Sequence, residues 1–223
     1  MNATIAPASE AGAADGLAVW IAPARTALLV IDMQVDFASP EGVLGGYGVD
    51  LSTVGPALAK AQNLVDAARQ AGVAVVFIGL QTSAEQDSPA WKERMRRQGG
   101  DPDQDSALCR VGTNGAAFVG PQPAPGELVI AKTRYSGFFG TDLDAELRRR
   151  GLDTIVACGL TTECCVDCTV RDAFHLDYHV FVARDASAAY ETDLHEGALK
   201  SLELNCAILV DSARVVSAWA KAA

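Results

Sequence analysis

The sequence is poor in histidine, in aromatic side chains and in positive charge. Its 223 residues include 3 histidines and 6% aromatic residues, and 28 acidic side chains outnumber 18 lysines and arginines. The formal charge of −10 and the pI near 4.7 disfavour binding to nucleic acids and to anionic membrane surfaces. We therefore expect the partner of this chain to be a small molecule, with no nucleic acid and no membrane involved.

Long hydrophobic runs are missing as well. No apolar stretch approaches the roughly 20 residues that a helix needs to cross a bilayer. The N-terminal sequence MNATIAPASEAGAADG has neither a basic start nor a continuous apolar centre, so it does not resemble a signal peptide. We expect a mobile arm over residues 1–19, a domain over residues 20–223 and a cytoplasmic location.

Cysteine is present, but in a pattern that does not indicate disulfide bonds. Six cysteines are spread over a long chain, at positions 109, 158, 164, 165, 168 and 206. Disulfide frameworks are typical of much shorter secreted domains. With 49% hydrophobic residues, the chain has enough apolar material for an ordinary core.

Apolar runs alternate with helical patterns along most of the chain. Strands are predicted at residues 26–32, 73–78, 127–132, 154–158, 180–183 and 207–210, and helices at 54–71, 142–150, 192–202 and 212–221. This alternation predicts a single doubly wound α/β domain with a mostly parallel sheet and helices on both faces. Residues 81–126 are polar and irregular, apart from a stretch at Trp91–Arg97 that is compatible with a short basic turn of helix. A connection of that length inside a compact domain is usually functional.

Three predicted strands lead to a reactive side chain. Asp32 and Lys132 end the first and third strands, and the stretch GLTTECCVDCTVRDA places Cys165 in the first turn of a helix after the fourth. The positive end of a helix dipole stabilises a thiolate, Asp32 can take the thiol proton, and the Lys132 ammonium can hold both anions. Taken singly, each residue also fits a plain structural role: a buried apolar cysteine, a helix cap and a surface lysine.

Several segments carry a resemblance to a known family. ALLVIDMQVDF (27–37), the run from Val129 to Ala173 that contains GLTTECCVDCTVRDA, and VFVARDA (180–186) resemble the isochorismatase-like cysteine hydrolases. This superfamily includes nicotinamidases, N-carbamoylsarcosine amidases and ureidoacrylate amidohydrolases. The likeness extends over nearly everything from about residue 20 onward.

The resemblance implies roles for individual residues. Cys165, which directly precedes a valine, matches the family's nucleophile, whereas Cys164 does not, and Asp32 and Lys132 match the other two members of a catalytic triad. It also implies a cis peptide bond before Thr161 and an oxyanion hole made by the backbone N–H groups of Thr161 and Cys165. The implied reaction is amide hydrolysis through a thioester, in an enzyme that assembles as a homo-oligomeric dimer or tetramer.

The substrate is less well defined than the reaction. AKTRYSGFF (131–139) resembles the ureidoacrylate amidohydrolases of pyrimidine breakdown, while biuret and N-carbamoyl amino acids remain alternatives. Gln34, Tyr135 and Phe138 are the candidate substrate-binding residues. The family's substrate-contacting loop falls near residues 81–92, where the sequence does not align clearly.

No metal and no cofactor are expected. Nicotinamidases resemble one another in an Asp-x-His and a further histidine that hold a metal, but the histidines here, His175, His179 and His195, all follow the nucleophile. A nicotinamidase-like hydrolase is therefore a weaker alternative. Cys165 and Cys168 form a C-x-x-C, but no second ligand pair lies at a spacing suited to zinc. A redox protein that uses these two cysteines is another alternative. A catalytically silent binding protein of the same fold is the non-enzymatic alternative.

Overall fold

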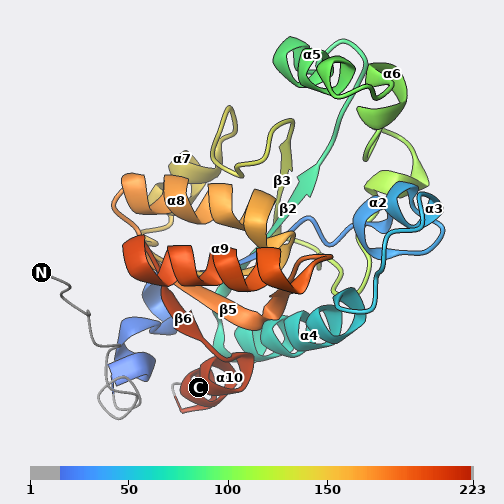
Figure 1. The fold of residues 1–223 in the computed structure, drawn as a ribbon. Coiled ribbons are helices and arrows are strands. Elements are labelled where there is room, and N and C mark those ends of the chain that lie inside the picture. Colours follow the sequence, from blue (N-terminus) through green and yellow to red (C-terminus); the bar gives the residue numbers. More distant parts are fainter. Residues whose placement is uncertain (1–15, 222–223) are drawn as a thin grey trace, which may run out of the picture.

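A six-stranded sheet lies at the centre of the molecule, with helices on both of its faces (Figure 1). The computed structural model of the chain describes residues 16–221. The strands are β1 (Thr26–Ile31), β2 (Ala74–Leu80), β3 (Leu128–Lys132), β4 (Thr154–Leu160), β5 (His179–Ala188) and β6 (Ile208–Val210). The longer helices are α4 (Val54–Ala71), α5 (Pro89–Arg97), α7 (Leu143–Arg149), α8 (Asp167–His175), α9 (Thr192–Asn205) and α10 (Ser212–Ala220).

The strand order across the sheet is β3-β2-β1-β4-β5-β6, and every neighbouring pair is parallel. The predicted doubly wound fold is confirmed, and the sheet is wholly rather than mostly parallel. The chain runs outward from β1 to β3 and then returns to place β4 on the other side of β1. Ligands of such sheets bind at the carboxyl ends of the strands, where the strand order reverses.

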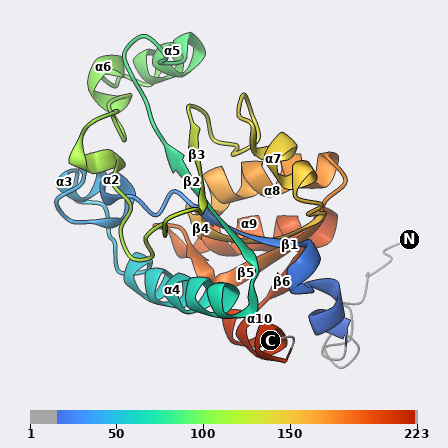
Figure 2. The same cartoon turned by 180° about the vertical axis from the view of Figure 1, so that it is seen from behind.

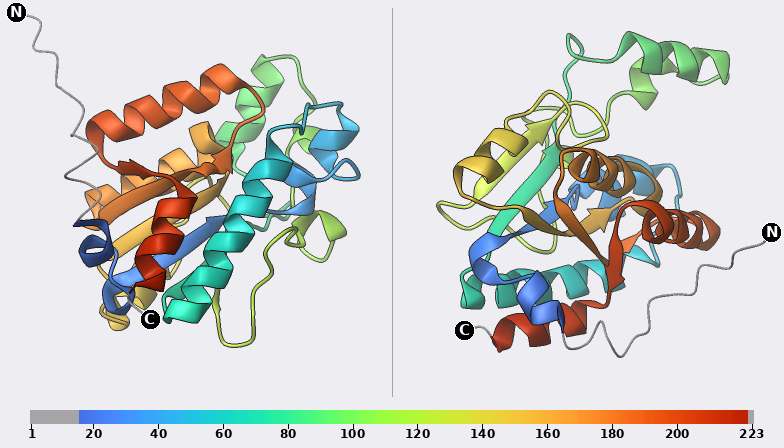
Figure 3. Two further views of the ribbon diagram at one scale, coloured as in Figure 1. Left: turned by 90° about the horizontal axis from the view of Figure 1, so that it is seen from below. Right: turned by 90° about the vertical axis from the view of Figure 1, so that its left-hand side faces the viewer.

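Alternate side chains of β1 pack into two separate hydrophobic cores, one on each face of the sheet. Leu28 and Val30 pack with buried residues of α4 and α10, whereas Leu29 and Ile31 pack with buried residues of α7, α8 and α9. Figures 1 and 2 show these two helical layers from opposite sides, and the left panel of Figure 3 shows α4 and α10 side by side. Burial on both faces explains why the strand is an unbroken apolar run.

The connections contain more helix than the sequence predicted. The segment after β1, for which the sequence predicted no helix, includes the short helices α2 (Val35–Ala38) and α3 (Val43–Gly46). Residues 81–126 contain α5, α6 (Pro102–Asp105) and the 3₁₀ turn η2 (Asn114–Ala116), and another 3₁₀ turn, η1 (Pro23–Arg25), precedes β1. The long segment is therefore a partly helical extension. Beyond the basic turn at Trp91–Arg97, the sequence showed no helical pattern there, because these helices have no buried face.

The α5–α6 extension stands away from the sheet, as the right panel of Figure 3 shows. Local signals start its helices: Ser88 accepts a hydrogen bond from the N–H of Trp91, and Asp101 accepts two at the start of α6. The Asp87 carboxylate accepts hydrogen bonds from both Nη atoms of Arg110, at 2.6 and 2.8 Å. This ion pair connects the two ends of the extension.

The N-terminal prediction is only partly within the structure. Residues 1–15 of the expected arm lie outside the described residues. Residues 16–20 are helical and Leu17 is 3% exposed in the core beside α10, so residues 16–19 belong to the domain and not to an arm. Across residues 16–221, no helix has the length and apolar character needed to span a membrane.

Candidate active site

Asp32 and Lys132 meet at the carboxyl edge of the sheet. Asp32 directly follows β1 with a φ of 49°, a left-handed conformation that few non-glycine residues adopt, and Lys132 is the last residue of β3. The Lys132 Nζ lies 2.7 Å from Asp32 Oδ2, and the two side chains are 0% and 1% exposed. The structure thus brings two of the predicted residues together as a buried ion pair across β2.

The backbone of β2 orients this pair. The Leu80 N–H donates to Asp32 Oδ1 at 3.0 Å and to Gln34 Oε1 at 2.8 Å. The Gln34 Nε2 donates in turn to the carbonyls of Leu80 and Ala116, at 2.9 and 2.8 Å. Because its amide is buried and fully engaged with backbone, Gln34 supports the site and does not face the substrate, which corrects its predicted binding role.

Cys165 enters the site from the turn between β4 and α8. Residues Thr162–Val166 form a π-helical turn, η3, and the α-helix begins only at Asp167. The Lys132 Nζ donates to Cys165 Sγ at 3.4 Å, so one ammonium contacts both the carboxylate and the thiol. The Thr169 hydroxyl donates to the Cys165 carbonyl at 2.6 Å and fixes the turn from the following helix. π-Helical turns often occur at functional sites.

The groups around Cys165 shift the pKa of its thiol in opposite directions. Its neighbour Cys164, its burial and the Asp32 carboxylate together raise the pKa of Cys165 well above the ordinary value, and the Lys132 ammonium offsets only part of this. Burial lowers the pKa of Lys132, but Asp32 and Cys165 outweigh burial and raise it overall. Burial and Asp32 thus oppose ionisation of the Cys165 thiol, whereas the Lys132 ammonium favours it.

The backbone before Cys165 has the predicted cis peptide bond, between Leu160 and Thr161. The Thr161 carbonyl accepts the N–H groups of Cys164 and Val166, both at 3.1 Å. Within residues 16–221, the Thr161 N–H itself donates to no acceptor. An unengaged N–H one turn from a thiol is available to bind an oxyanion.

A cavity of about 640 Å³ opens onto this site. Its wall includes Asp32, Thr161 and Cys165 from the sheet edge, together with the predicted Tyr135. Phe138 is absent from the wall, because its ring packs against Tyr178 with the ring centroids 5.7 Å apart. Tyr135 therefore keeps its predicted place in the site, and Phe138 belongs to the core.

The opposite wall of the cavity was not predicted residue by residue. Trp91 and Arg94 of α5 line it. Tyr190, which follows β5, also lines the cavity, and its hydroxyl donates to the Phe37 carbonyl at 2.8 Å. The sequence indicated a short basic helix at Trp91–Arg97 but contained no signal for where it lies. Only the folded path of residues 81–126 brings α5 over the sheet edge.

The histidines do not gather at the site. Among residues 16–221, no group of three or more His, Cys, Asp or Glu side chains is arranged to hold a metal ion. His195 forms a hydrogen bond through Nδ1 with the Thr162 hydroxyl, at 2.8 Å, and burial lowers its pKa. The side chains present therefore do not fit the metal centre of nicotinamidases, and His195 instead braces the turn that holds Cys165.

The doubly wound sheet gathers a carboxylate, an ammonium and a thiol at its carboxyl edge, beside a cavity, and nucleophilic catalysis uses groups of these kinds. Comparison with known proteins identifies the family. Residues 26–214 match the family model described as the isochorismatase domain. The chain belongs to the isochorismatase family.

Relatives in this family include amidohydrolases. The ureidoacrylate amidohydrolase RutB of Methylobacterium radiotolerans is 38% identical over 194 residues, which cover 81% of this chain and 74% of that protein. A cysteine hydrolase from Pseudomonas syringae pv. phaseolicola superposes with a TM-score of 0.79 at 28% identity, covering 92% and 96% of the two chains. The N-carbamoylsarcosine amidase of Thermoplasma acidophilum has a TM-score of 0.66 at 27% identity, covering 84% and 96%. These similarities support an enzyme of the amidohydrolase class.

Proposed function

We propose that this protein is a metal-independent cysteine amidohydrolase that cleaves a C–N bond of a small ureido, carbamoyl or amide substrate through a thioester. One observation carries the proposal: a single buried ammonium, Lys132 Nζ, lies 2.7 Å from the Asp32 carboxylate and 3.4 Å from the Cys165 thiol. The thiol is exposed to a cavity large enough for a small organic molecule.

The roles of the triad follow from its protonation states. Because its pKa is raised, Lys132 stays charged and cannot act as the base. Asp32, linked to the thiol through Lys132, is therefore the group that accepts the thiol proton when Cys165 attacks. Lys132 stabilises both the carboxylate before the transfer and the sulfur anion after it.

The reaction proceeds in two halves. The Cys165 sulfur forms a bond to the carbonyl carbon, and the resulting oxyanion binds the N–H groups of Thr161 and Cys165. Asp32 passes the proton to the leaving nitrogen, the C–N bond breaks, and ammonia or an amine departs. Water then gives a proton to Asp32 and attacks the thioester, the C–S bond breaks, and the proton returns to the sulfur.

Ureidoacrylate-like compounds are the first candidate substrates. The relative named above is a ureidoacrylate amidohydrolase by name, and AKTRYSGFF (131–139), which resembles those enzymes, contains Lys132. Biuret and N-carbamoyl amino acids are alternatives of the same reaction class. The structural similarity to an N-carbamoylsarcosine amidase supports testing them as well. A nicotinamidase-like reaction is the weaker alternative, because the described residues do not form the metal site of nicotinamidases.

The test measures ammonia release from ureidoacrylate, biuret, N-carbamoyl amino acids and nicotinamide. We expect turnover of at least one ureido compound, with Cys165→Ala lowering kcat by at least about 10³-fold. Cys168→Ala is the matched control: this half-buried cysteine lies one residue into α8 and outside the cavity wall, and its loss should leave kcat nearly unchanged. Full activity in Cys165→Ala would refute the proposal.

Two other readings give different results in the same experiments. A silent binding protein would bind a ureido acid without releasing ammonia from any compound. A redox protein would form a Cys165–Cys168 disulfide after mild oxidation, which peptide mass spectrometry detects. All six cysteines are free thiols in the structure.

A further inference from the structure

The charged side chains on the cavity wall are not equally neutralised. Asp32 is paired with Lys132, and Glu163 accepts a hydrogen bond from the Thr161 hydroxyl at 2.8 Å. The other charged wall residues are the arginines Arg94 and Arg134. In the described part of the chain, neither arginine has a carboxylate within ion-pair distance, so the cavity presents two uncompensated guanidinium groups.

Arg94 differs in this respect from its neighbours on α5. Lys92 lies 2.6 Å from Asp103, and both Arg96 and Arg97 pair with Glu93. Within residues 16–221, the Arg94 side chain has neither an ion pair nor a hydrogen bond, and it is the basic residue of α5 that reaches the cavity. A cation left unpaired on a helix otherwise rich in ion pairs is available for a ligand.

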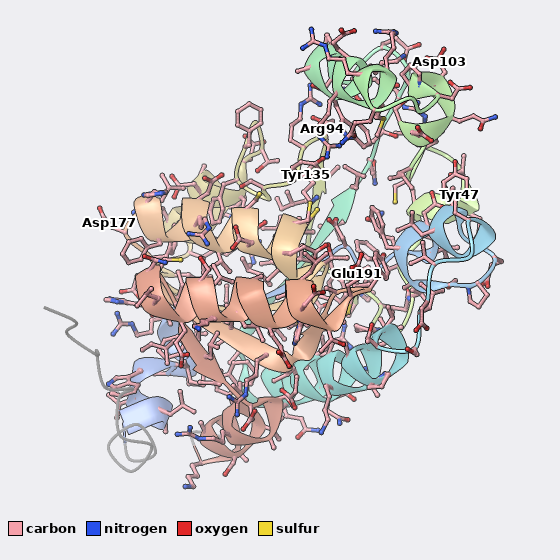
Figure 4. All side chains as sticks on the ribbon, in the orientation of Figure 1. Tyr47, Arg94, Asp103, Tyr135, Asp177 and Glu191 are labelled. Atoms are coloured by element: carbon pink, nitrogen blue, oxygen red, sulfur yellow. The ribbon has the colours of Figure 1, made fainter. Side chains whose placement is uncertain are left out.

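Arg134 extends this positive region toward the triad. Its carbonyl accepts a hydrogen bond from Lys132 Nζ at 3.0 Å, which places its backbone beside the reacting groups. Its Nη1 donates to the carbonyls of Thr133 and Gln86, at 2.7 and 3.2 Å, and within residues 16–221 its Nε and Nη2 have no acceptor. Gln86 belongs to the segment that leads into α5, so Arg134 links the loop after β3 to that segment. Figure 4 shows Arg94 and Tyr135 in the space between α5 and the loop after β3.

The two ends of the cavity differ in the charge that stays uncompensated. At the sheet edge, the Asp32 carboxylate is paired with Lys132, and Glu163 is the other acid of the wall. Arg94 lies on the side of α5 and has no carboxylate partner among the described residues. An anionic end of a substrate is therefore repelled by Glu163 and attracted toward α5.

We propose that the site selects substrates that carry a carboxylate, which Arg94 binds through its guanidinium fork with Arg134 contributing a further N–H. The inference rests on the proposed amidohydrolase function and deepens it: the substrate class is a small ureido or amide acid, with its carboxylate toward α5 and its carbonyl at Cys165. Guanidinium groups bind carboxylates with two parallel hydrogen bonds, a geometry that also fixes the orientation of a small substrate.

The experiment compares the ureido acid that releases ammonia fastest with its own methyl ester. We expect the wild-type kcat/KM for the acid to exceed that for the ester at least tenfold. Arg94→Met should lower kcat/KM for the acid by roughly 10- to 100-fold, mostly through KM, and change the ester less than about threefold. Arg94→Lys should retain part of the preference, because it keeps the charge but loses the fork.

Arg97→Ala is the matched control on the same helix, since Arg97 pairs with Glu93 and lies outside the cavity wall. Arg97→Ala should leave kcat/KM unchanged for both the acid and the ester. Equal turnover of acid and ester by the wild type, or equal losses for both in Arg94→Met, would overturn the carboxylate inference while leaving the amidohydrolase intact. Absence of any Cys165-dependent ammonia release would instead overturn the proposed function, and the inference with it.

Discussion

The sheet edge and the α5–α6 extension form the two walls of one cavity, but they are built in opposite ways. At the sheet edge, an ion pair with 0% and 1% exposed side chains is held between parallel strands. On the extension, the charges are mostly at the surface, as in the pair of Arg97 and Glu93 with side chains 77% and 44% exposed. The difference suggests that the core fixes the chemistry, while a surface segment adjusts which molecules reach it.

The largest effect is expected at the buried pair. Lys132→Met leaves the Asp32 carboxylate buried without its cation, which typically costs about 3–5 kcal/mol of the free energy of unfolding. Activity should fall by at least about 10³-fold, because the thiol loses its neighbouring charge. Urea denaturation and ammonia release measure the two losses.

A double variant separates the two losses at this pair. Asp32→Asn combined with Lys132→Met removes both charges and keeps an acceptor for the Leu80 N–H. It should regain most of the lost stability and remain inactive. A Lys132→Met protein as stable as the wild type would contradict the buried pair as the organising feature of this wall.

A smaller and more local effect is expected at Asp87, the main anchor of the extension. This side chain is 2% exposed and accepts hydrogen bonds from Arg110 at 2.6 Å and from the Ser106 hydroxyl at 3.0 Å. Asp87→Asn should lower the free energy of local unfolding of the extension by about 1.5–3 kcal/mol. Hydrogen exchange over residues 81–116 measures this change. KM should rise while kcat changes less, since the sheet edge is untouched. A fall in kcat alone, with KM constant, would contradict the division between the two walls.

The pH dependence of this anchor has a defined sign. The hydrogen bond from Arg110 is the largest cause that lowers the pKa of Asp87. A lowered pKa means that the stabilisation is fully present above the ordinary carboxyl pKa of about 3.9 and is lost as the pH falls through the lowered value. Hydrogen exchange in the extension should therefore accelerate at strongly acidic pH in the wild type and show no such step in Asp87→Asn.

The smallest effect is expected at Glu93, on the outer face of α5. Its pairs with Arg96 and Arg97 are solvent-exposed, and such pairs contribute little to stability. Glu93→Gln should leave Tm, KM and kcat within experimental error of the wild type. A clear rise in KM would show that the whole ion-pair network of α5, and not Arg94 and the Asp87 anchor, shapes the cavity.

The sheet edge could be predicted from the sequence, because it follows from periodicity and topology. Apolar runs located the strands, and parallel strands bring their carboxyl ends to one edge, so Asp32 and Lys132 were expected to meet. The cis peptide bond before Thr161 came from the family resemblance alone. The pKa of the Cys165 thiol could not be derived in this way, because it depends on burial and on Cys164 and Asp32, which an argument from a helix dipole leaves out.

The second wall could not be predicted in the same way. It depends on contacts between surface residues far apart in the chain, such as Asp87 with Arg110, that leave no periodic pattern. Gln34 and Phe138 were assigned to the substrate because they neighbour reactive residues in the sequence. Their side chains turn away from the cavity, toward the backbone around Leu80 and toward Tyr178.

The most direct test of the account is the search for the covalent intermediate. The enzyme would be mixed with its fastest ureido substrate, quenched in acid within milliseconds and digested for peptide mass spectrometry. We predict an acyl adduct on Cys165 that appears before steady-state ammonia release and is absent from Cys164, Cys168 and the Cys165→Ala protein. Steady turnover without any adduct, together with retained activity in Cys165→Ala, would contradict it.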